Sequence, residues 1–334
     1  MRVELAPITY WRHDLSHCLH TTAGVLLGFH GLDPVEVLGA AWGFYYPGDV
    51  RREEYYFPGA AESLLGGLAP YHAIRSRWHT PADADEGWRQ VRAMVAGGAP
   101  VAVAADNFHL PFRPAYRDVH TNHLLAVYGF DDRTGEVLVA DPVPPAFQGP
   151  IPLAAFTAAR DSQNPVRHSR DLFFTANPIG NRWLELDVGA EQPAFTADFV
   201  RYVLGENLRG FTAPSDDTYR GRSGLSRFLD DVITRIADDP AAVDEAFVVL
   251  GPVLAVTGLH AEYLALAGRR FDDRRLYELG RLVDAVAHDW AALRIAVATC
   301  GTAGAAGRKS ARHRAASLLA AHDRALSAMA DAAR

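Results

Sequence analysis

The chain has 334 residues, of which 49% are hydrophobic and 22% are charged, as in an ordinary globular protein. Its length is sufficient for two domains, each with a hydrophobic core of its own. The formal net charge of −7 gives no reason to expect binding to nucleic acid or to an anionic membrane. The two cysteines, Cys18 and Cys300, lie far apart in the sequence and indicate no disulfide framework, so we expect a protein of the reducing cytoplasm.

The sequence also predicts no membrane anchor. No run of apolar residues reaches the ~18–20 that a transmembrane helix needs. The first residues, MRVELAPITYWRHD, are charged and aromatic and do not resemble a signal peptide.

The first half of the chain predicts helices followed by strands. SHCLHTTAGVLL, residues 16–27, predicts a buried helix with Cys18 in its first turn. Asp33 and Pro34 cap a second helix, which continues as VEVLGAAWGF. Further elements are a short helix over 60–69, a strand over 71–79, a helix over 81–98, a strand over 100–106, a strand pair over 122–141 and a strand over 171–178. A helical block followed by several strands indicates an α+β domain.

Beyond about residue 180 the pattern is helical throughout. Helical spacing and good helix formers occupy 195–209, 223–237, 241–267, 273–298 and 311–333, and the small-residue segment 298–314 predicts a flexible turn between two of these helices. We therefore predict an α+β catalytic domain over residues 1–180 and a mostly helical domain over residues 181–334. The helical domain either shapes a substrate pocket or forms a homodimer, and the sequence leaves both open.

A cysteine in the first turn of a helix has the chemistry of a nucleophile. Unpaired backbone N–H groups and the helix dipole favour the thiolate of Cys18 over the thiol. Cysteine catalysis also needs a histidine and a polar residue that orients it. His123 begins one strand of the predicted pair and Asp141 ends the other, so both lie at the same end of the sheet. Cys18, His123 and Asp141 are our candidate catalytic residues.

Other residues compete for these roles. His120 is the alternative to His123, which we favour because it directly precedes the apolar run of the strand. Asp106 and Asn107 are alternatives to Asp141 as the orienting group. Cys300 lies among small residues and is expected to be structural. His17 and Cys18 are adjacent and no zinc-ligand spacing is present, so we predict no metal site.

Several strings resemble known families. His123 with LLAVYGFDD, followed by Asp141 and Pro142, resembles the papain-like fold and in particular its leader-peptidase branch. HCLHTTAGVLL and GFHGLDPVEVLGAAWGFYY look like the N-terminal domain of the butirosin biosynthesis protein H family, with the helical half in the place of that family's C-terminal domain. The resemblance implies a papain-like cysteine peptidase fold, in which the cysteine-bearing helix packs on an antiparallel sheet.

The resemblance further implies an acyltransferase of secondary metabolism. Family members are thought to take an acyl group from the phosphopantetheine thioester of an acyl or peptidyl carrier protein and pass it to an amine. Cys18 would carry the acyl group, His123 would deprotonate the small-molecule amine acceptor, and no bound cofactor is implied. A peptidase, or an amide or thioester hydrolase, would use the same residues with water as acceptor.

The oxyanion hole departs from the papain-like pattern. That pattern has a glutamine about six residues before the cysteine, and this chain has Arg12 there. The backbone N–H of Cys18 is one candidate donor, and the side chains of His17, His13, Arg12 and Asn122 are the others. The missing glutamine is also the main support for a third hypothesis, a non-catalytic binding or scaffold module.

Overall fold

The computed structural model describes the chain except for residues 47–64, 168–176, 214–218 and 237–238, and except for the side chains of 240, 241, 244, 248 and 301–303. The chain divides into two compact units. The first unit comprises Met1–Pro34 and Arg75–Val188, and the second comprises Val35–Ile74 and Gly189–Arg334. Both units therefore draw on residues before position 180, where the sequence analysis drew a single boundary.

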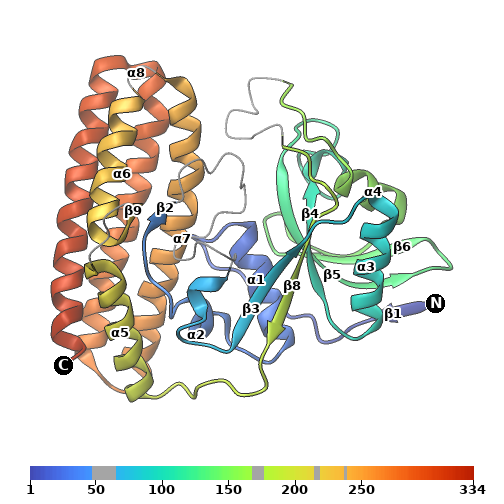
Figure 1. Cartoon of the computed structure of the whole chain (residues 1–334), viewed down its shortest axis with the longest axis horizontal. Helices are drawn as coiled ribbons and strands as arrows, with labels where there is room; N and C mark the ends of the chain where they lie inside the picture. Colours follow the sequence, from blue (N-terminus) through green and yellow to red (C-terminus); the bar gives the residue numbers. More distant parts are fainter. Residues whose placement is uncertain (47–64, 168–176, 214–218, 237–238) are drawn as a thin grey trace. The chain divides into compact units, whose positions relative to one another are not determined.

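The first unit is built on a seven-stranded sheet (Figure 1). Its strands follow the order β3 (Ile74–His79), β8 (Trp183–Val188), β4 (Val101–Asp106), β5 (Asn122–Asp131), β6 (Glu136–Asp141) and β7 (Phe147–Pro152), and β1 (Arg2–Glu4) pairs antiparallel with β5. The pairs β4–β5, β5–β6, β6–β7 and β4–β8 are antiparallel. The predicted strands over 71–79, 100–106 and 122–141 are confirmed, whereas most of the predicted strand 171–178 lies outside the described residues.

Helices cover both faces of this sheet. α3 (Ala84–Ala96) and α4 (Leu153–Arg160) lie on one side and α1 (Cys18–Phe29) on the other (Figure 1). One face of β4 and β5 contributes to a core that is shared with α3 and α4, through Val101, Val103, Ala105, Leu125 and Val127. The residues between them, Ala102, Ala104, Leu124 and Ala126, are just as buried but lie outside that core, because α1 packs against their face. Thr22 on α1 also donates a hydrogen bond to the Leu124 carbonyl of β5, at 3.0 Å.

The second helix, α2 (Pro34–Leu38), ends earlier than predicted. At Gly39 a Cβ atom would lie 2.5 Å from the Val35 carbonyl oxygen, 2.7 Å from that of Leu259 and 2.7 Å from Tyr263 Cβ. The chain therefore needs a residue without a side chain here, because α7 passes too close for one. Of the predicted helix 60–69, the described part contains only the short 3-10 helix η2 (Gly66–Leu68).

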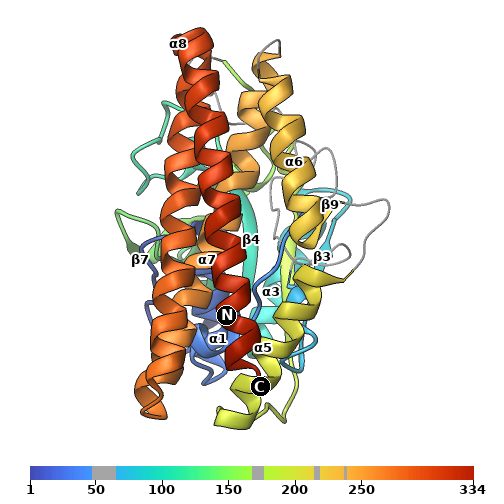
Figure 2. The same ribbon diagram turned by 90° about the vertical axis from the view of Figure 1, so that its left-hand side faces the viewer.

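The second unit consists mainly of helices. These are α5 (Ala197–Thr212), α6 (Gly221–Arg235), α7 (Pro240–Arg270) and α8 (Arg274–Ala332), with a small antiparallel pair of β2 (Tyr45–Tyr46) and β9 (Tyr219–Arg220). Gly304 has φ 54° and ψ −130°, which is not helical, so α8 consists of two arms that lie side by side in both views (Figures 1 and 2). The predicted turn within 298–314 is thus confined to one glycine. An antiparallel sheet with helices, followed by a helical C-terminal region, confirms the predicted α+β class.

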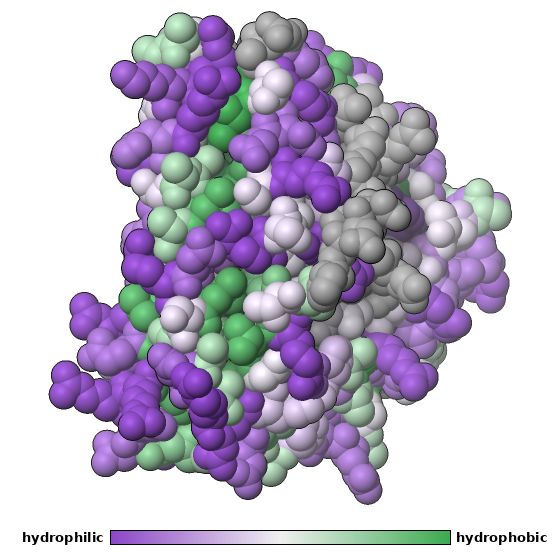
Figure 3. Space-filling model, turned by 60° about the vertical axis from the view of Figure 1, so that its left-hand side comes forward, coloured by the Kyte–Doolittle hydropathy of each residue, from purple (hydrophilic) through white to green (hydrophobic). Residues whose placement is uncertain are grey.

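The core of the helical unit is centred on Trp42. Its ring stacks on His260, with centroids 5.3 Å apart, and on His322, with centroids 5.4 Å apart. Both histidines are buried, and burial lowers the pKa of His260 to about 4 and that of His322 to about 3. The face of this unit seen in Figure 3 carries hydrophilic side chains with smaller hydrophobic areas between them.

One helix of the second unit is apolar over most of its length. The stretch Glu245–Arg270 of α7 is long and apolar enough to cross a membrane by length and composition, with a hydropathy of 1.5. However, 82% of its most apolar window is buried inside the structure, as in the core helix of a soluble protein. A helix enclosed by other helices is apolar on several faces, so this stretch does not test the expectation that the chain has no membrane anchor.

Candidate active site

Cys18 is the first residue of helix α1, and a tight turn leads into it. The backbone N–H of Ser16 donates to the His13 carbonyl at 3.0 Å, and the Ser16 hydroxyl donates to the same oxygen at 2.6 Å. His17 is the N-cap, with an extended backbone and a ring that accepts a hydrogen bond from the Leu19 N–H. Cys18 is half-buried, and its backbone N–H is one of the first N–H groups of the helix, which have no partner within the helix itself.

His123 and Asp141 meet at one end of the β5–β6 pair. Because β5 begins at Asn122 and β6 ends at Asp141, the antiparallel register brings the first residues of one strand beside the last residue of the other. His123 Nε2 lies 2.7 Å from Asp141 Oδ2, and both side chains are buried. The other oxygen of Asp141 accepts a hydrogen bond from the Val143 N–H at 3.0 Å, which fixes the carboxylate.

The surroundings of Cys18 and His123 shift the pKa values of both side chains. Burial alone would raise the pKa of Cys18, but its interactions with His123 and His17 outweigh burial and lower the pKa to about 5. Burial alone would lower the pKa of His123, but Asp141 and the Cys18 thiolate raise it to about 9. Between these two pKa values, and hence at neutral pH, the pair is a thiolate and an imidazolium.

The comparison with known families agrees with the resemblance seen in the sequence. Residues 17–142 match the family model described as "Butirosin biosynthesis protein H, N-terminal". The chain carries a domain of this family. The butirosin H domain includes Cys18, His123 and Asp141, and it also spans Val35–Ile74, which belongs to the second structural unit. No curated protein matches the chain.

Arg113 is a residue of the butirosin H domain's site that the sequence analysis missed. It lies in the loop between β4 and β5, and its side chain is only 10% exposed. Arg113 Nη1 lies 3.3 Å from Asp141 Oδ2 and donates to the Val143 carbonyl at 2.9 Å. It therefore contacts the same oxygen of Asp141 as His123 does and helps to hold the carboxylate in place. The loop also contains Arg117, and nothing in the sequence distinguishes the two arginines.

The four side chains that are candidate donors of the oxyanion hole differ in exposure and in their hydrogen-bond partners. His17 caps the helix beside Cys18 and helps to lower the pKa of its thiol. Arg12 is 40% exposed and its Nη2 lies 3.7 Å from Asp14. The ring of His13 accepts a hydrogen bond from the Leu15 N–H at 3.2 Å, within its own turn. Asn122 is the first residue of β5 and is paired with Asp106 of β4.

The alternative histidine, His120, belongs to a second cluster. Its Nδ1 lies 2.6 Å from Asp106 Oδ2, not from Asp141. Asp106 also accepts hydrogen bonds from the Ser162 hydroxyl at 2.6 Å and from the backbone N–H groups of Phe108 and Thr121. The structure thus separates two Asp–His pairs in the butirosin H domain, and only His123 with Asp141 is coupled to Cys18.

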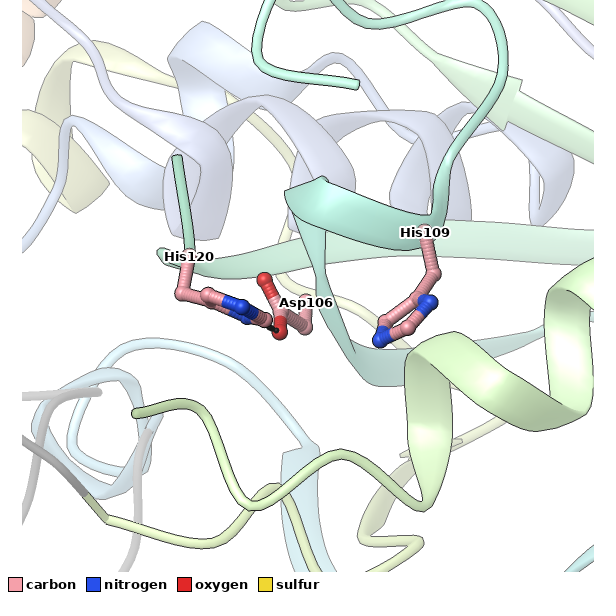
Figure 4. Close-up of side chains that lie close together, drawn as sticks. All are labelled: Asp106, His109 and His120. Atoms are coloured by element: carbon pink, nitrogen blue, oxygen red, sulfur yellow. Dashed lines mark hydrogen bonds and ion pairs between the residues drawn. The ribbon is translucent and has the colours of Figure 1, made fainter. Parts of the chain in front are cut away.

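Among the described residues, this second cluster is the group that could hold a metal ion. Asp106, His109 and His120 offer ligand atoms within 4.8 Å of one another, and the two rings approach Asp106 from opposite sides (Figure 4). Ligands at ~2.1 Å from a tetrahedral ion lie about 3.4 Å apart, farther than the 2.6 Å between Asp106 and His120. With four hydrogen bonds on its carboxylate, Asp106 fits the role of holding the loop that carries Arg113.

Cys300 has no comparable surroundings. It is buried in α8, and its Sγ donates to the Ala296 carbonyl at 3.2 Å. Burial raises the pKa of the Cys300 thiol, which favours the unreactive protonated form.

Proposed function

We propose that the chain is a cysteine-dependent acyltransferase of secondary metabolism. The observation that carries the proposal is the Cys18 thiolate at the start of α1, paired with an imidazolium that Asp141 orients. The fold supports the same conclusion, because a cysteine-bearing helix on an antiparallel sheet, with a histidine at the start of a strand, is the arrangement of papain-like enzymes. The match to an antibiotic-biosynthesis family supports a biosynthetic role.

The first half-reaction loads the enzyme. The Cys18 thiolate attacks the carbonyl carbon of a thioester, and a new S–C bond forms as the carbonyl oxygen becomes an oxyanion. When this intermediate collapses, the bond to the donor sulfur breaks. His123 supplies its proton to the departing thiolate, which leaves an acyl-Cys18 thioester and a neutral imidazole.

The second half-reaction transfers the acyl group. An amine attacks the carbonyl carbon of acyl-Cys18, and neutral His123 takes the proton that the nitrogen loses. The C–S bond then breaks, the amide leaves, and the thiolate–imidazolium pair is restored. The raised pKa of His123, about 9, suits a base that must accept a proton from an amine.

The proposal includes a partner and a setting. A thioester donor of this class is carried on the phosphopantetheine arm of a carrier protein, and the acceptor is a small-molecule amine in the cytoplasm. The chemistry uses no bound cofactor. The helical unit would either shape the pocket for the acceptor or pair two copies of the chain.

Partition of the acyl group between acceptors tests the proposal. The enzyme is incubated with acyl N-acetylcysteamine thioesters, which mimic the end of the phosphopantetheine arm, with and without a panel of amines. We expect amide products whose rate depends on the amine and is lost in Cys18→Ala. Release of free acid at one rate, whatever the amine, would instead identify a hydrolase. Absence of any turnover, together with slow alkylation of Cys18, would identify a non-catalytic module.

A further inference from the structure

The N-cap position of His17 decides which of its ring nitrogens carries a proton. Its Nδ1 accepts a hydrogen bond from the Leu19 N–H at 3.4 Å, as the side chain of an N-cap residue does. A nitrogen that accepts a hydrogen bond carries no proton, so the ring proton of neutral His17 is on Nε2. The helix start therefore fixes His17 as an Nε2–H donor.

This donor lies next to the nucleophile and is held in place. Nε2 is buried and makes no hydrogen bond among the described residues. The His17 ring interacts with the neighbouring Cys18 thiolate and lowers the pKa of the thiol. The His17 ring packs edge-on against His20, with centroids 4.7 Å apart and planes at 89°, and His20 is completely buried. The orientation of the ring is thus set by the cap on one side and by packing on the other.

We propose that His17 Nε2–H, together with the backbone N–H of Cys18, forms the oxyanion hole of the acyl transfer. The inference rests on the proposed function and assigns a further catalytic residue to it. An oxyanion hole requires donors that are fixed before the reaction and are aimed at the place where negative charge develops. A buried N–H on the residue next to the nucleophile, with no hydrogen-bond acceptor in the described part of the chain, meets that requirement.

The other candidates fit the role less well. Arg12 occupies the sequence position where papain-like enzymes have glutamine, but its side chain is 40% exposed and its Nη2 lies 3.7 Å from Asp14. The Nδ1 of His13 is occupied by the Leu15 N–H in the preceding turn. The role of the missing glutamine has therefore moved from six residues before the cysteine to the residue directly before it.

Three variants separate this role from the capping role. His17→Asn keeps an excellent N-cap acceptor but is too short to donate in place of Nε2. His17→Gln keeps an N–H donor on a longer side chain. Arg12→Ala serves as the matched control. Each variant is assayed for acylation of Cys18 by an acyl N-acetylcysteamine thioester and for alkylation by iodoacetamide, with thermal unfolding as a check of the fold.

The two reactions differ in their need for an oxyanion hole. Acylation passes through an oxyanion, whereas alkylation is a direct displacement and reports only on the thiolate. We expect His17→Asn to slow acylation by about 100- to 1,000-fold more than it slows alkylation. His17→Gln should recover part of the loss, and Arg12→Ala should change neither rate by more than about twofold.

Equal losses in both reactions, or no loss of acylation in His17→Asn, would overturn the assignment of His17 while leaving the proposed function intact. A wild-type enzyme that alkylates readily but is never acylated by the thioester would overturn the proposed function, and the role of His17 with it.

Discussion

Replacing Asp141 with asparagine should uncouple the Cys18–His123 pair. The 2.7 Å hydrogen bond and the charge of Asp141 are, with the Cys18 thiolate, the causes that raise the pKa of His123 to about 9 against the opposing effect of burial. Without the charge of Asp141, only Cys18 opposes the effect of burial, so the pKa of His123 falls. The Cys18 thiolate then loses its cationic partner at neutral pH.

The size of the effect follows from the two pKa values. With a pKa of about 5, Cys18 is about 90% thiolate at pH 6. With the ordinary thiol pKa of ~8.5, it would be about 0.3% thiolate at the same pH. A thiolate of higher pKa is intrinsically more reactive, so the midpoint of the pH profile is a better measure than any single rate. We expect Asp141→Asn to move that midpoint upward by about 3 pH units.

The assay is the rate of Cys18 alkylation by iodoacetamide between pH 4 and pH 10, followed by mass spectrometry. In the wild type the rate should rise as pH increases through about 5 and then level off, since the thiolate is the reactive form. Asp132→Asn is the matched control, because Asp132 lies at the turn of the same β5–β6 pair, at the far end from His123. A midpoint that stays near 5 in Asp141→Asn would refute the electrostatic account.

Three further predictions concern stability. Gly24→Ala should destabilise the protein by about 1–3 kcal/mol in urea unfolding, because its Cβ would lie 2.1 Å from Trp11. Gly28→Ala in the same helix should be neutral or stabilising. Equal effects of the two substitutions would contradict the packing of Trp11 on Gly24. Asp106→Ala should cost about 3 kcal/mol or more, since four donors lose a charged acceptor; a loss below about 1 kcal/mol would contradict the role of Asp106 in holding the loop. In the folded protein His322 takes up a proton only near its pKa of about 3, whereas in the unfolded chain it does so near ~6.5. The free energy of unfolding therefore falls as the pH drops below ~6.5. His322→Gln should reduce this dependence of the unfolding free energy on pH by up to about 1.4 kcal/mol per pH unit, and an unchanged dependence would argue against a buried neutral His322.

The elements that local patterns specify were predictable from the sequence. Asp83 caps α3 as its carboxylate suggests, and the apolar runs on either side of Gly135 form the β5–β6 pair. Cys18 begins a helix because a capping residue precedes it and an apolar helical pattern follows. These features depend on neighbours within a few residues.

The elements that distant partners specify were not predictable. β7 contains Gly149 and Pro150 and has no strand pattern of its own, but pairing with β6 makes it a strand. Arg113 has its role only because the loop folds back onto Asp141. Position 39, directly after α2, needs glycine because α7, more than two hundred residues later, leaves no space for a side chain.

The most direct test of the central claim is intact-protein mass spectrometry of the enzyme with an acyl thioester, followed by peptide mapping. We predict one acyl group on the wild type, located on Cys18, which disappears when an accepted amine is added and never forms on Cys18→Ala. An adduct that persists on Cys18→Ala, or a wild-type protein that remains unmodified while Cys18 is rapidly alkylated, would contradict the account.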